Sequence, residues 1–377
     1  MDLYPISSKS LEKFYHIDGD LLGQQYKDHM SDYHQWEQKD HADQWIIFPE
    51  NIGPRLSIDE PSPSNGELYT VVTNKDAHGK KGALVAIVVG VQSEHVISVI
   101  NRIPFKYRQK VIEITLDMAN TMNLIVKRCF PNAERVIDRF HVQKLAYDAL
   151  QEMRIAHRWD AINEETDAIQ NARLEHRYYS PEVLPNGDTK KLLLFRSRYL
   201  LFKSPEKWTS QQSSRAKILF DLYPDIKKAY WLVHKLRVIY NTSKHRGIAY
   251  KKLALWFNEV TDSRFKSFNT ISATIYSHYN EILNYFNNRA TNASAESFNA
   301  KIKRFRTTLH GVRDLKFFFY RLAKIYAYIL SLHLFFQLLR DHPKPKRDHP
   351  KRDYPKLQRD YLKRSPDINE KSTYNFL

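Results

Sequence analysis

Hydrophobic residues between positions 55 and 137 occur in short runs bounded by turn-forming residues, a pattern that predicts β-strands. The expected strands are residues 56–60, 68–73, 83–89, 111–116 and 135–137. The third run is almost continuously apolar, as is typical of a strand at the centre of a sheet. Helical spacing of apolar positions at residues 93–103 and 121–130 places one helix in each gap between the last three strands. This order predicts an α/β fold, a mixed sheet flanked by helices.

The rest of the chain follows different patterns. Residues 1–54 are polar and aromatic and end near two prolines, so we expect a helical lead-in to the core at residues 55–144. Helical spacing predicts an all-helical insertion at residues 145–285, and residues 286–339 are expected to form the closing helices of the core. Residues 340–377 repeat a basic, acidic, aromatic, Pro, Lys unit, which predicts a disordered basic tail that is either a DNA-binding arm or a solvated end.

Composition narrows the class of protein. Lysine and arginine number 59 against 42 aspartate and glutamate, a formal charge of +17. This excess favours nucleic acid as a partner, although a basic solvated surface would give the same count. Cys129 is the only cysteine, which excludes an intramolecular disulfide and a cysteine-based zinc site and agrees with a reducing compartment. The longest apolar stretch, residues 317–339, is interrupted by charges, so we expect a soluble, cytoplasmic protein without a membrane partner.

Three acidic residues occupy positions where a metal-dependent nuclease would need carboxylates. Asp59 lies on the first expected strand and Asp117 directly follows the fourth. If the five expected strands are arranged in the order 3-2-1-4-5, these two strands are neighbours and both side chains meet at one edge. Glu296 lies on a helix expected at residues 293–305 that can pack across that edge. Carboxylates suit Mg²⁺, but an acid at a strand end is also commonly a helix cap or a turn former, so spacing alone leaves both interpretations open.

Several longer motifs surround these acids. They are Ile-Asp-Glu at 58–60 with Tyr-Thr-Val-Val at 69–72, Ile-Thr-Leu-Asp-Met at 114–118, Phe-Pro-Asn-Ala at 130–133, Asp-Arg-Phe-His-Val at 138–142, and Thr-Asn-Ala-Ser-Ala-Glu-Ser-Phe-Asn at 291–299 with Lys-Ile-Lys at 301–303 and Gly-Val-Arg at 311–313. Together and in this order, over roughly residues 56–330, they resemble the DDE transposases of bacterial insertion sequences, specifically the ISL-three group.

The resemblance implies an RNase H-like fold in which Asp59, Asp117 and Glu296 bind two Mg²⁺ ions, with Mn²⁺ as the expected substitute. Such enzymes cleave the ends of the element with water and then use the freed 3′-hydroxyl to attack target DNA. It also implies double-stranded DNA as the partner, oligomers assembled on DNA, and a bacterial cytoplasm in which the bound protein associates with the nucleoid. A non-catalytic DNA-binding protein derived from a transposase, or an RNase H-like nuclease without joining activity, are the alternatives.

The second acid of the triad has two candidates, because Asp138 also ends an expected strand. We favour Asp117, since the fourth strand is the usual position of the second acid in this fold. Asp138 and His141 then resemble the motif of Asp or Cys, two residues and His found just downstream in related transposases. His141 fits a metal ligand, a base, or a hydrogen-bond partner of Asp138 that orders the wall of the site.

Residues around Glu296 complete the predicted site. Asn292 and Asn299 share its helix face, and Asn299 fits a phosphate contact, a group that orients a carboxylate, or a simple satisfied polar residue. Four basic residues are predicted to contact the DNA backbone, with a solvated charged face as the alternative: Lys303, Arg304, Arg306 and Arg313.

One feature departs from the resemblance. Members of the ISL-three group usually begin with a zinc-binding and helix-turn-helix region that recognises the ends of the element, whereas here the first catalytic strand is expected by residue 56. We hypothesise that a separately encoded N-terminal region, or one joined by frameshifting, supplies this recognition.

Overall fold

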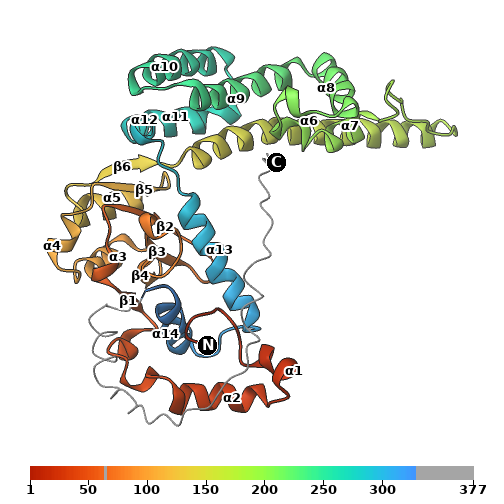
Figure 1. Cartoon of the computed structure of the whole chain (residues 1–377). Helices are drawn as coiled ribbons and strands as arrows, with labels where there is room; N and C mark the ends of the chain where they lie inside the picture. Colours follow the sequence, from red (N-terminus) through yellow and green to blue (C-terminus); the bar gives the residue numbers. More distant parts are fainter. Residues whose placement is uncertain (63–65, 328–377) are drawn as a thin grey trace, which may run out of the picture. The chain divides into compact units, whose positions relative to one another are not determined.

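The computed structural model describes residues 1–62 and 66–327, and these contain a mixed sheet with helices on both faces (Figure 1). The order of the strands is β1-β4-β3-β2-β5-β6. β2 runs parallel to β5 and β5 parallel to β6, whereas the other pairs are antiparallel. The strands are β1 (Trp45–Ile47), β2 (Arg55–Asp59), β3 (Tyr69–Asn74), β4 (Leu84–Val89), β5 (Glu113–Leu116) and β6 (Glu134–Ile137).

The five expected strands have the order 3-2-1-4-5 that was assumed for them, and the predicted RNase H-like α/β fold is confirmed. β1 is an addition that the sequence did not predict. It lies within the expected helical lead-in, pairs antiparallel with β4, and places Ile46 opposite Ile87 at the edge of the sheet. A strand of three residues just before Pro49 is too short to show an alternating pattern, so only its pairing identifies it.

The α-helices cover both faces of the sheet and form the insertion. Their bounds are α1 (Glu12–Tyr15), α2 (Gly19–Gln25), α3 (Ser93–Ile100), α4 (Phe105–Arg108), α5 (Asn120–Cys129), α6 (Arg139–Leu174), α7 (Lys190–Arg196), α8 (Ser210–Leu222), α9 (Pro224–Thr242), α10 (Arg246–Ser263), α11 (Asn269–Ser277), α12 (Tyr279–Asn288), α13 (Ala293–Thr308) and α14 (Leu315–Tyr326). The tail expected at residues 340–377, and the part of the last predicted helix beyond residue 327, lie outside the described residues.

Alternation along β2 separates the two faces of the sheet. Leu56 and Ile58 are buried against the apolar residues of α3 and α5, which form one core cluster with the central strands. Ser57 and Asp59 therefore point to the opposite face, because successive side chains of a strand alternate. That opposite face is covered by α13 and α14, whose apolar residues pack with Tyr69, Val71 and the aromatic side chains of the lead-in.

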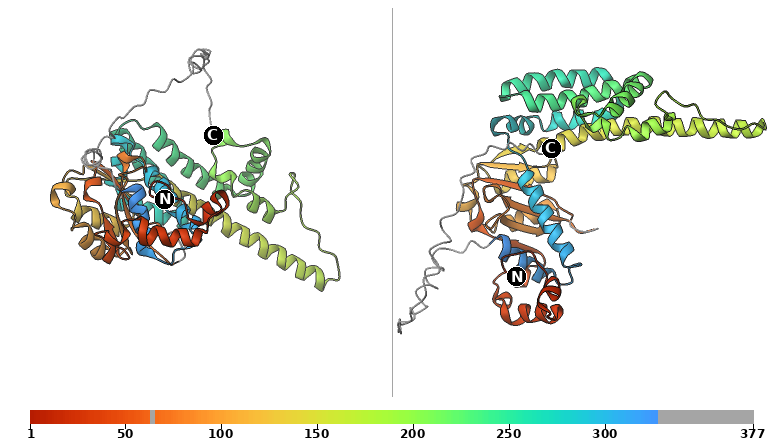
Figure 2. Two further views of the ribbon diagram at one scale, coloured as in Figure 1. Left: turned by 60° about the horizontal axis from the view of Figure 1, so that its bottom comes forward. Right: turned by 45° about the vertical axis from the view of Figure 1, so that its right-hand side comes forward.

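The helical block that follows β6 has a core of its own. α6 is a single helix of 36 residues that begins directly after β6, and residues from α6 to α12 form one hydrophobic cluster (Figure 2). α12 returns to the sheet, where the Asn284 side-chain amide donates to the Arg135 carbonyl of β6 over 2.9 Å. The chain then enters α13 and crosses the face of the sheet that carries Asp59. None of the helices in the described part of the chain is long and apolar enough to span a bilayer.

Candidate functional site

Three acidic residues stand at the ends of neighbouring strands. Asp59 is the last residue of β2, whereas Asp117 and Asp138 directly follow β5 and β6. Because β2, β5 and β6 run in the same direction, their carboxyl ends lie at one edge of the sheet. Burial is the largest cause of the raised pKa of Asp59, and the negative charge of the neighbouring Asp117 raises that pKa further.

Glu296 reaches the same edge from the first turn of α13. One ligand atom each from Asp138, His141 and Glu296 lie within 4.8 Å of one another, so these three residues could hold a metal ion. Asp138 is buried, His141 is half-buried and Glu296 is exposed, which leaves the group open to solvent on one side. The group of possible metal ligands found among the described residues therefore combines Asp138 and His141 with Glu296.

Both oxygens of the Asp59 carboxylate are held in place. The backbone N–H of Glu60 donates to Oδ1 over 2.9 Å, and the side-chain amide of Asn299 donates to Oδ2 over 2.6 Å. Asn299 lies on α13, so its hydrogen bond joins the two elements that carry Asp59 and Glu296. Of the roles that the sequence left open for Asn299, this geometry matches a group that orients a carboxylate.

Asn292 is the residue at which α13 is attached to the sheet. It immediately precedes α13 and is fully buried, and its side-chain oxygen accepts a hydrogen bond from the hydroxyl of Ser57 on β2. The backbone N–H groups of Asn292 and Phe140 face the Asp138 carboxylate and lower its pKa, although burial raises that pKa more strongly. Asn292 therefore links the start of α13 both to β2 and to the end of β6.

His141 lies between the acids. Its Nδ1 is 3.4 Å from an Asp117 oxygen, and one of its ring nitrogens also lies within 4.8 Å of a carboxylate oxygen of Asp138. A positive charge on the imidazole opposes the rise that burial causes in the pKa values of Asp59, Asp138 and Glu296. The histidine is thus placed to balance part of the negative charge at this edge.

Burial has the opposite effect and is the largest cause of a raised pKa at Asp59, Asp138 and Glu296. The charge of Asp138 raises the pKa of Glu296 further. Ionised carboxylates in such a cluster are costly unless a cation shares the site.

Glu60 is a member of this cluster that the sequence reasoning missed. Burial raises its pKa, as do the charges of Asp117 and Asp59, and its Oε1 is buried without a hydrogen-bond partner among the described residues. The sequence signal for Glu60 was its position directly after Asp59 in the first motif. It was missed because adjacent residues of a strand point to opposite faces of a sheet. The strand ends at Asp59, which frees Glu60 from that rule.

The residues present fit a divalent cation of the Mg²⁺ type. The donor set is rich in carboxylate oxygens, which hard cations prefer. In addition, Glu60 Oε1 and Asn299 Oδ1 are buried oxygens that accept no hydrogen bond within the described residues. A bound cation would stabilise the ionised form of these acids and would give the unpartnered oxygens a positive group to contact.

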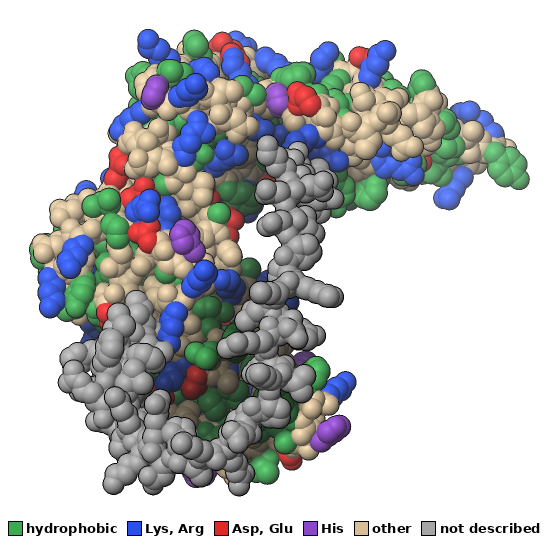
Figure 3. Space-filling model, in the orientation of Figure 1, with side chains coloured by type: hydrophobic (Ala, Val, Ile, Leu, Met, Phe, Trp, Pro, Cys, Tyr) green, Lys and Arg blue, Asp and Glu red, His purple; other side chains and the backbone are tan. Residues whose placement is uncertain are grey.

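The four predicted DNA-contacting residues divide into two groups. Lys303, Arg304 and Arg313 are exposed. Arg306 instead forms a two-pronged ion pair with Glu67, with nitrogen-to-oxygen distances of 2.6 and 2.8 Å. Lysine and arginine side chains are spread widely over the face of the molecule in Figure 3, with acidic side chains more sparsely placed among them.

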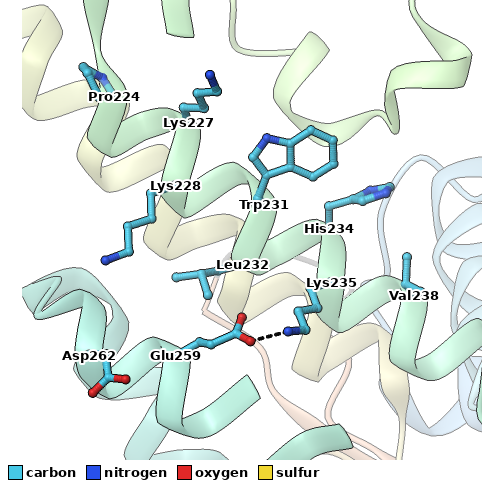
Figure 4. A pocket seen from close by; sticks show the side chains of 10 residues that line it. All are labelled: Pro224, Lys227, Lys228, Trp231, Leu232, His234, Lys235, Val238, Glu259 and Asp262. Atoms are coloured by element: carbon cyan, nitrogen blue, oxygen red, sulfur yellow. Dashed lines mark hydrogen bonds and ion pairs between the residues drawn. The ribbon is translucent and has the colours of Figure 1, made fainter. Parts of the chain in front are cut away.

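A separate groove of about 690 Å³ lies between α9 and α10, away from these acids in the sequence (Figure 4). Trp231, which is partly exposed, lines it together with Lys227 and Lys228, while Lys235 pairs with Glu259. Its basic groups are partly balanced by acidic ones, and it contains none of the predicted site residues.

With this fold and cluster of acids described, the comparison with known families assigns the class of the protein. Residues 56–322 match the DDE_Tnp_ISL3 family, described as a transposase family. Because the match covers more than half of the chain, the protein belongs to this family.

Two curated relatives are similar to the same part of the chain. Both are the transposase for insertion sequence element IS1557, from two strains of Mycobacterium tuberculosis. Each is 26% identical over 268 residues, which is 69% of this chain and 57% of the relative. The chain thus spans little more than half the length of the curated relatives it matches.

Proposed function

We propose that the protein is an insertion-sequence transposase that cleaves DNA at the ends of the element and transfers the strands by a two-metal DDE mechanism. The observation that carries the proposal is the meeting of Asp59, Asp117 and Asp138 at one edge of the sheet, with Glu296 brought to them by α13. Family membership and the transposases that the chain resembles support the same activity. The formal charge of +17 supports double-stranded DNA as substrate and target.

Asp59, Asp117 and Glu296 are the proposed catalytic carboxylates and metal ligands. Bound Mg²⁺ or Mn²⁺ ions would activate the attacking water or 3′-hydroxyl and stabilise the leaving oxygen. The side chains of the protein do the positioning: Asn299 and the Glu60 backbone N–H fix both oxygens of Asp59, and His141 contacts Asp117. Fixed ligands of this kind lower the barrier because no reorganisation is needed during the reaction.

The alternative second acid is Asp138, and a specific observation favours it. Its carboxylate, and not that of Asp117, forms the compact group with His141 and Glu296. We retain Asp117 because Asp138 is buried and faced by two backbone N–H groups, which suits a residue that joins α6 and α13. Asp117 is half-buried and follows the strand adjacent to β2, as expected of a ligand that must reach DNA.

Strand transfer with a pre-cut duplex tests the proposal directly. The duplex has the sequence of the DNA that flanks the gene, and the reaction contains Mn²⁺. Because the duplex is already cut, the assay measures strand transfer without the cleavage step. Wild type is compared with Asp117→Asn, Asp138→Asn and Glu296→Gln. Joining that is lost in the Asp117 and Glu296 variants and retained in the Asp138 variant supports the proposed triad.

Other outcomes select the alternatives. Loss of both joining and metal binding in a folded Asp138→Asn variant, with activity kept in Asp117→Asn, makes Asp138 the second acid. Cleavage without joining identifies a nuclease. Salt-sensitive DNA binding that none of the three substitutions changes, without any reaction, identifies a binding protein, unless the product of the upstream reading frame restores joining by supplying end recognition.

A further inference from the structure

A second groove of the insertion holds three arginines that have no acidic partner in the described part of the chain. It lies between α6 and α7, has a volume of about 440 Å³, and is lined by Arg154 and Arg158 of α6 and by Arg198, which follows α7. We call it the arginine groove. It contains none of the acids of the candidate catalytic site.

Two of the arginines lie on the same face of α6 because of their spacing along the helix. Gln151, Arg154 and Arg158 are spaced so that all three lie on one face of α6, the face that packs against α7. Arg154 is only 5% exposed, and it donates from Nε to the Gln151 side chain over 2.7 Å and from Nη1 to the Leu194 carbonyl over 2.9 Å. These two hydrogen bonds hold the buried guanidinium rigidly at the base of the groove.

The arginines of the groove form no ion pairs within the residues that the structure describes. None of the three arginines forms an ion pair within residues 1–62 and 66–327, and the one acid that lines the groove, Asp148, pairs with none of them there. Burial lowers the pKa of Arg154, and the neighbouring charges of Arg198 and Arg158 lower it further. Three guanidinium groups that repel one another at a partly buried position are stabilised by a bound anion.

Two further features indicate what kind of anion the groove accepts. Nε of Arg158 is buried and has no hydrogen-bond partner among the described residues, so the guanidinium group has an unsatisfied donor. Trp159 and Phe195 also line the groove and are 59% and 57% exposed, which gives the anion site an apolar border. Guanidinium groups bind phosphate oxygens through two parallel hydrogen bonds, and an apolar border suits the sugar and base that adjoin a phosphodiester.

The groove between α9 and α10 is the weaker candidate for the same ligand. Two acids, Glu259 and Asp262, line it beside its lysines, and Lys235 is already paired with Glu259 (Figure 4). A lysine is also a less specific phosphate ligand than a guanidinium. The arginine groove has more uncompensated positive charge and a more rigid base.

We propose that the arginine groove binds a phosphodiester of DNA, so that the insertion fixes DNA at a point separate from the acids that cleave it. The proposal rests on the proposed function, because it takes DNA as the substrate. Phosphate contacts of this kind position a duplex and carry no sequence information.

The test measures binding of the full chain to a short fluorescein-labelled duplex by anisotropy, between about 50 and 200 mM salt and with EDTA present. Arg158→Gln and Arg198→Gln are made singly and together, and Arg154 is left intact because its hydrogen bond to the Leu194 carbonyl joins α6 to α7. The matched control is Arg173→Gln, which removes the same charge from an exposed position of α6 outside the groove.

We expect the double variant to bind about tenfold more weakly than the control, with the slope of log affinity against log salt smaller by about 0.9 for each phosphate released. Its melting temperature should not fall below that of the control, because the substitutions relieve repulsion. Equal affinities and equal slopes for the double variant and Arg173→Gln would overturn the proposal, as would a wild type that binds no DNA.

Failure of the proposed function gives a different result. Wild type that binds DNA in a salt-sensitive way but joins no strands, with binding weakened by the groove variants alone, would remove the catalytic proposal and support the arginine groove. If strand transfer is normal and the groove variants bind DNA as the control does, the catalytic proposal is supported and the arginine-groove proposal is removed.

Discussion

The attachment of α13 to the sheet through Ser57 and Asn292 should be worth a measurable part of the stability of the core. Both residues are 0% exposed, and the Ser57 hydroxyl donates to the Asn292 side-chain oxygen. Asn292→Ala leaves a buried hydroxyl without its acceptor, which should cost about 2 kcal/mol of unfolding free energy. Ser57→Ala leaves a buried carbonyl oxygen without its donor and should cost about 1–2 kcal/mol.

The interaction itself is isolated by a double-mutant cycle. Once both polar partners are gone, neither leaves the other unsatisfied, so Ser57→Ala combined with Asn292→Ala should be less destabilised than the two single effects added together. We expect a coupling energy of about 1–2 kcal/mol, measured by urea unfolding of the four proteins followed by circular dichroism. Ser213→Ala, on an exposed site of α8, is the control for a serine substitution and should change the stability little.

The same cycle has a functional side. Glu296 lies one turn after Asn292 on α13, so loosening this attachment should reduce strand transfer more than it reduces the folded fraction. Strict additivity of the two substitutions would refute the claim that the buried hydrogen bond links β2 to α13. Full strand-transfer activity in a measurably destabilised Asn292→Ala protein would refute the claim that this link positions Glu296.

Three further predictions concern the acids. Asn299→Ala removes the 2.6 Å donor to Asp59 and should lower the rate of strand transfer by about 10–100-fold with little loss of stability, measured at saturating Mn²⁺. Mn²⁺ at about 100 times its dissociation constant should raise the melting temperature by about 4 °C, and Glu296→Gln should abolish this shift in a fluorimetric melt. In the metal-free protein, burial raises the pKa of Asp138, so ionisation of this carboxyl destabilises the fold as pH rises above about 4, the ordinary carboxyl pKa. The stability of Asp138→Asn relative to wild type, measured by urea unfolding, should therefore increase from acid to neutral pH. A difference that does not change with pH would contradict this.

Much of the sheet could be predicted from the sequence because its signals are local. Each expected strand is a short apolar run bounded by turn residues, and the change to alternating strands and helices restricts the possible topologies to a few. The motif at 138–142 marks the end of β6 and the start of α6 in one stretch of chain. β1 could not be predicted in this way, since three residues contain too little pattern and its identity depends on pairing with β4.

The site was only partly predictable for the same reason. The local pattern places Asp59 and Asp117 at the ends of two strands, and these ends are neighbours because the strand order has the form that the sequence reasoning assumed. The approach of Asp138 to Glu296, and the pairing of Asn299 with Asp59, join residues separated by more than a hundred positions, and only the packing of α13 on the sheet brings them together.

Arg306 and Arg158 show what tertiary structure alone decided. Sequence assigned Arg306 to the DNA-facing basic residues because charge and helical spacing indicate a face but not a partner, and in the fold it pairs with Glu67. Arg158 lies in a segment with no recognisable motif; helical spacing puts it beside Arg154, but only the packing of α6 on α7 adds Arg198 to the same groove. Hydrophobic periodicity along the chain therefore determined which elements form, whereas the pairing and neutralisation of charges depended on contacts between distant elements, because a charge is satisfied by whatever group the fold places beside it.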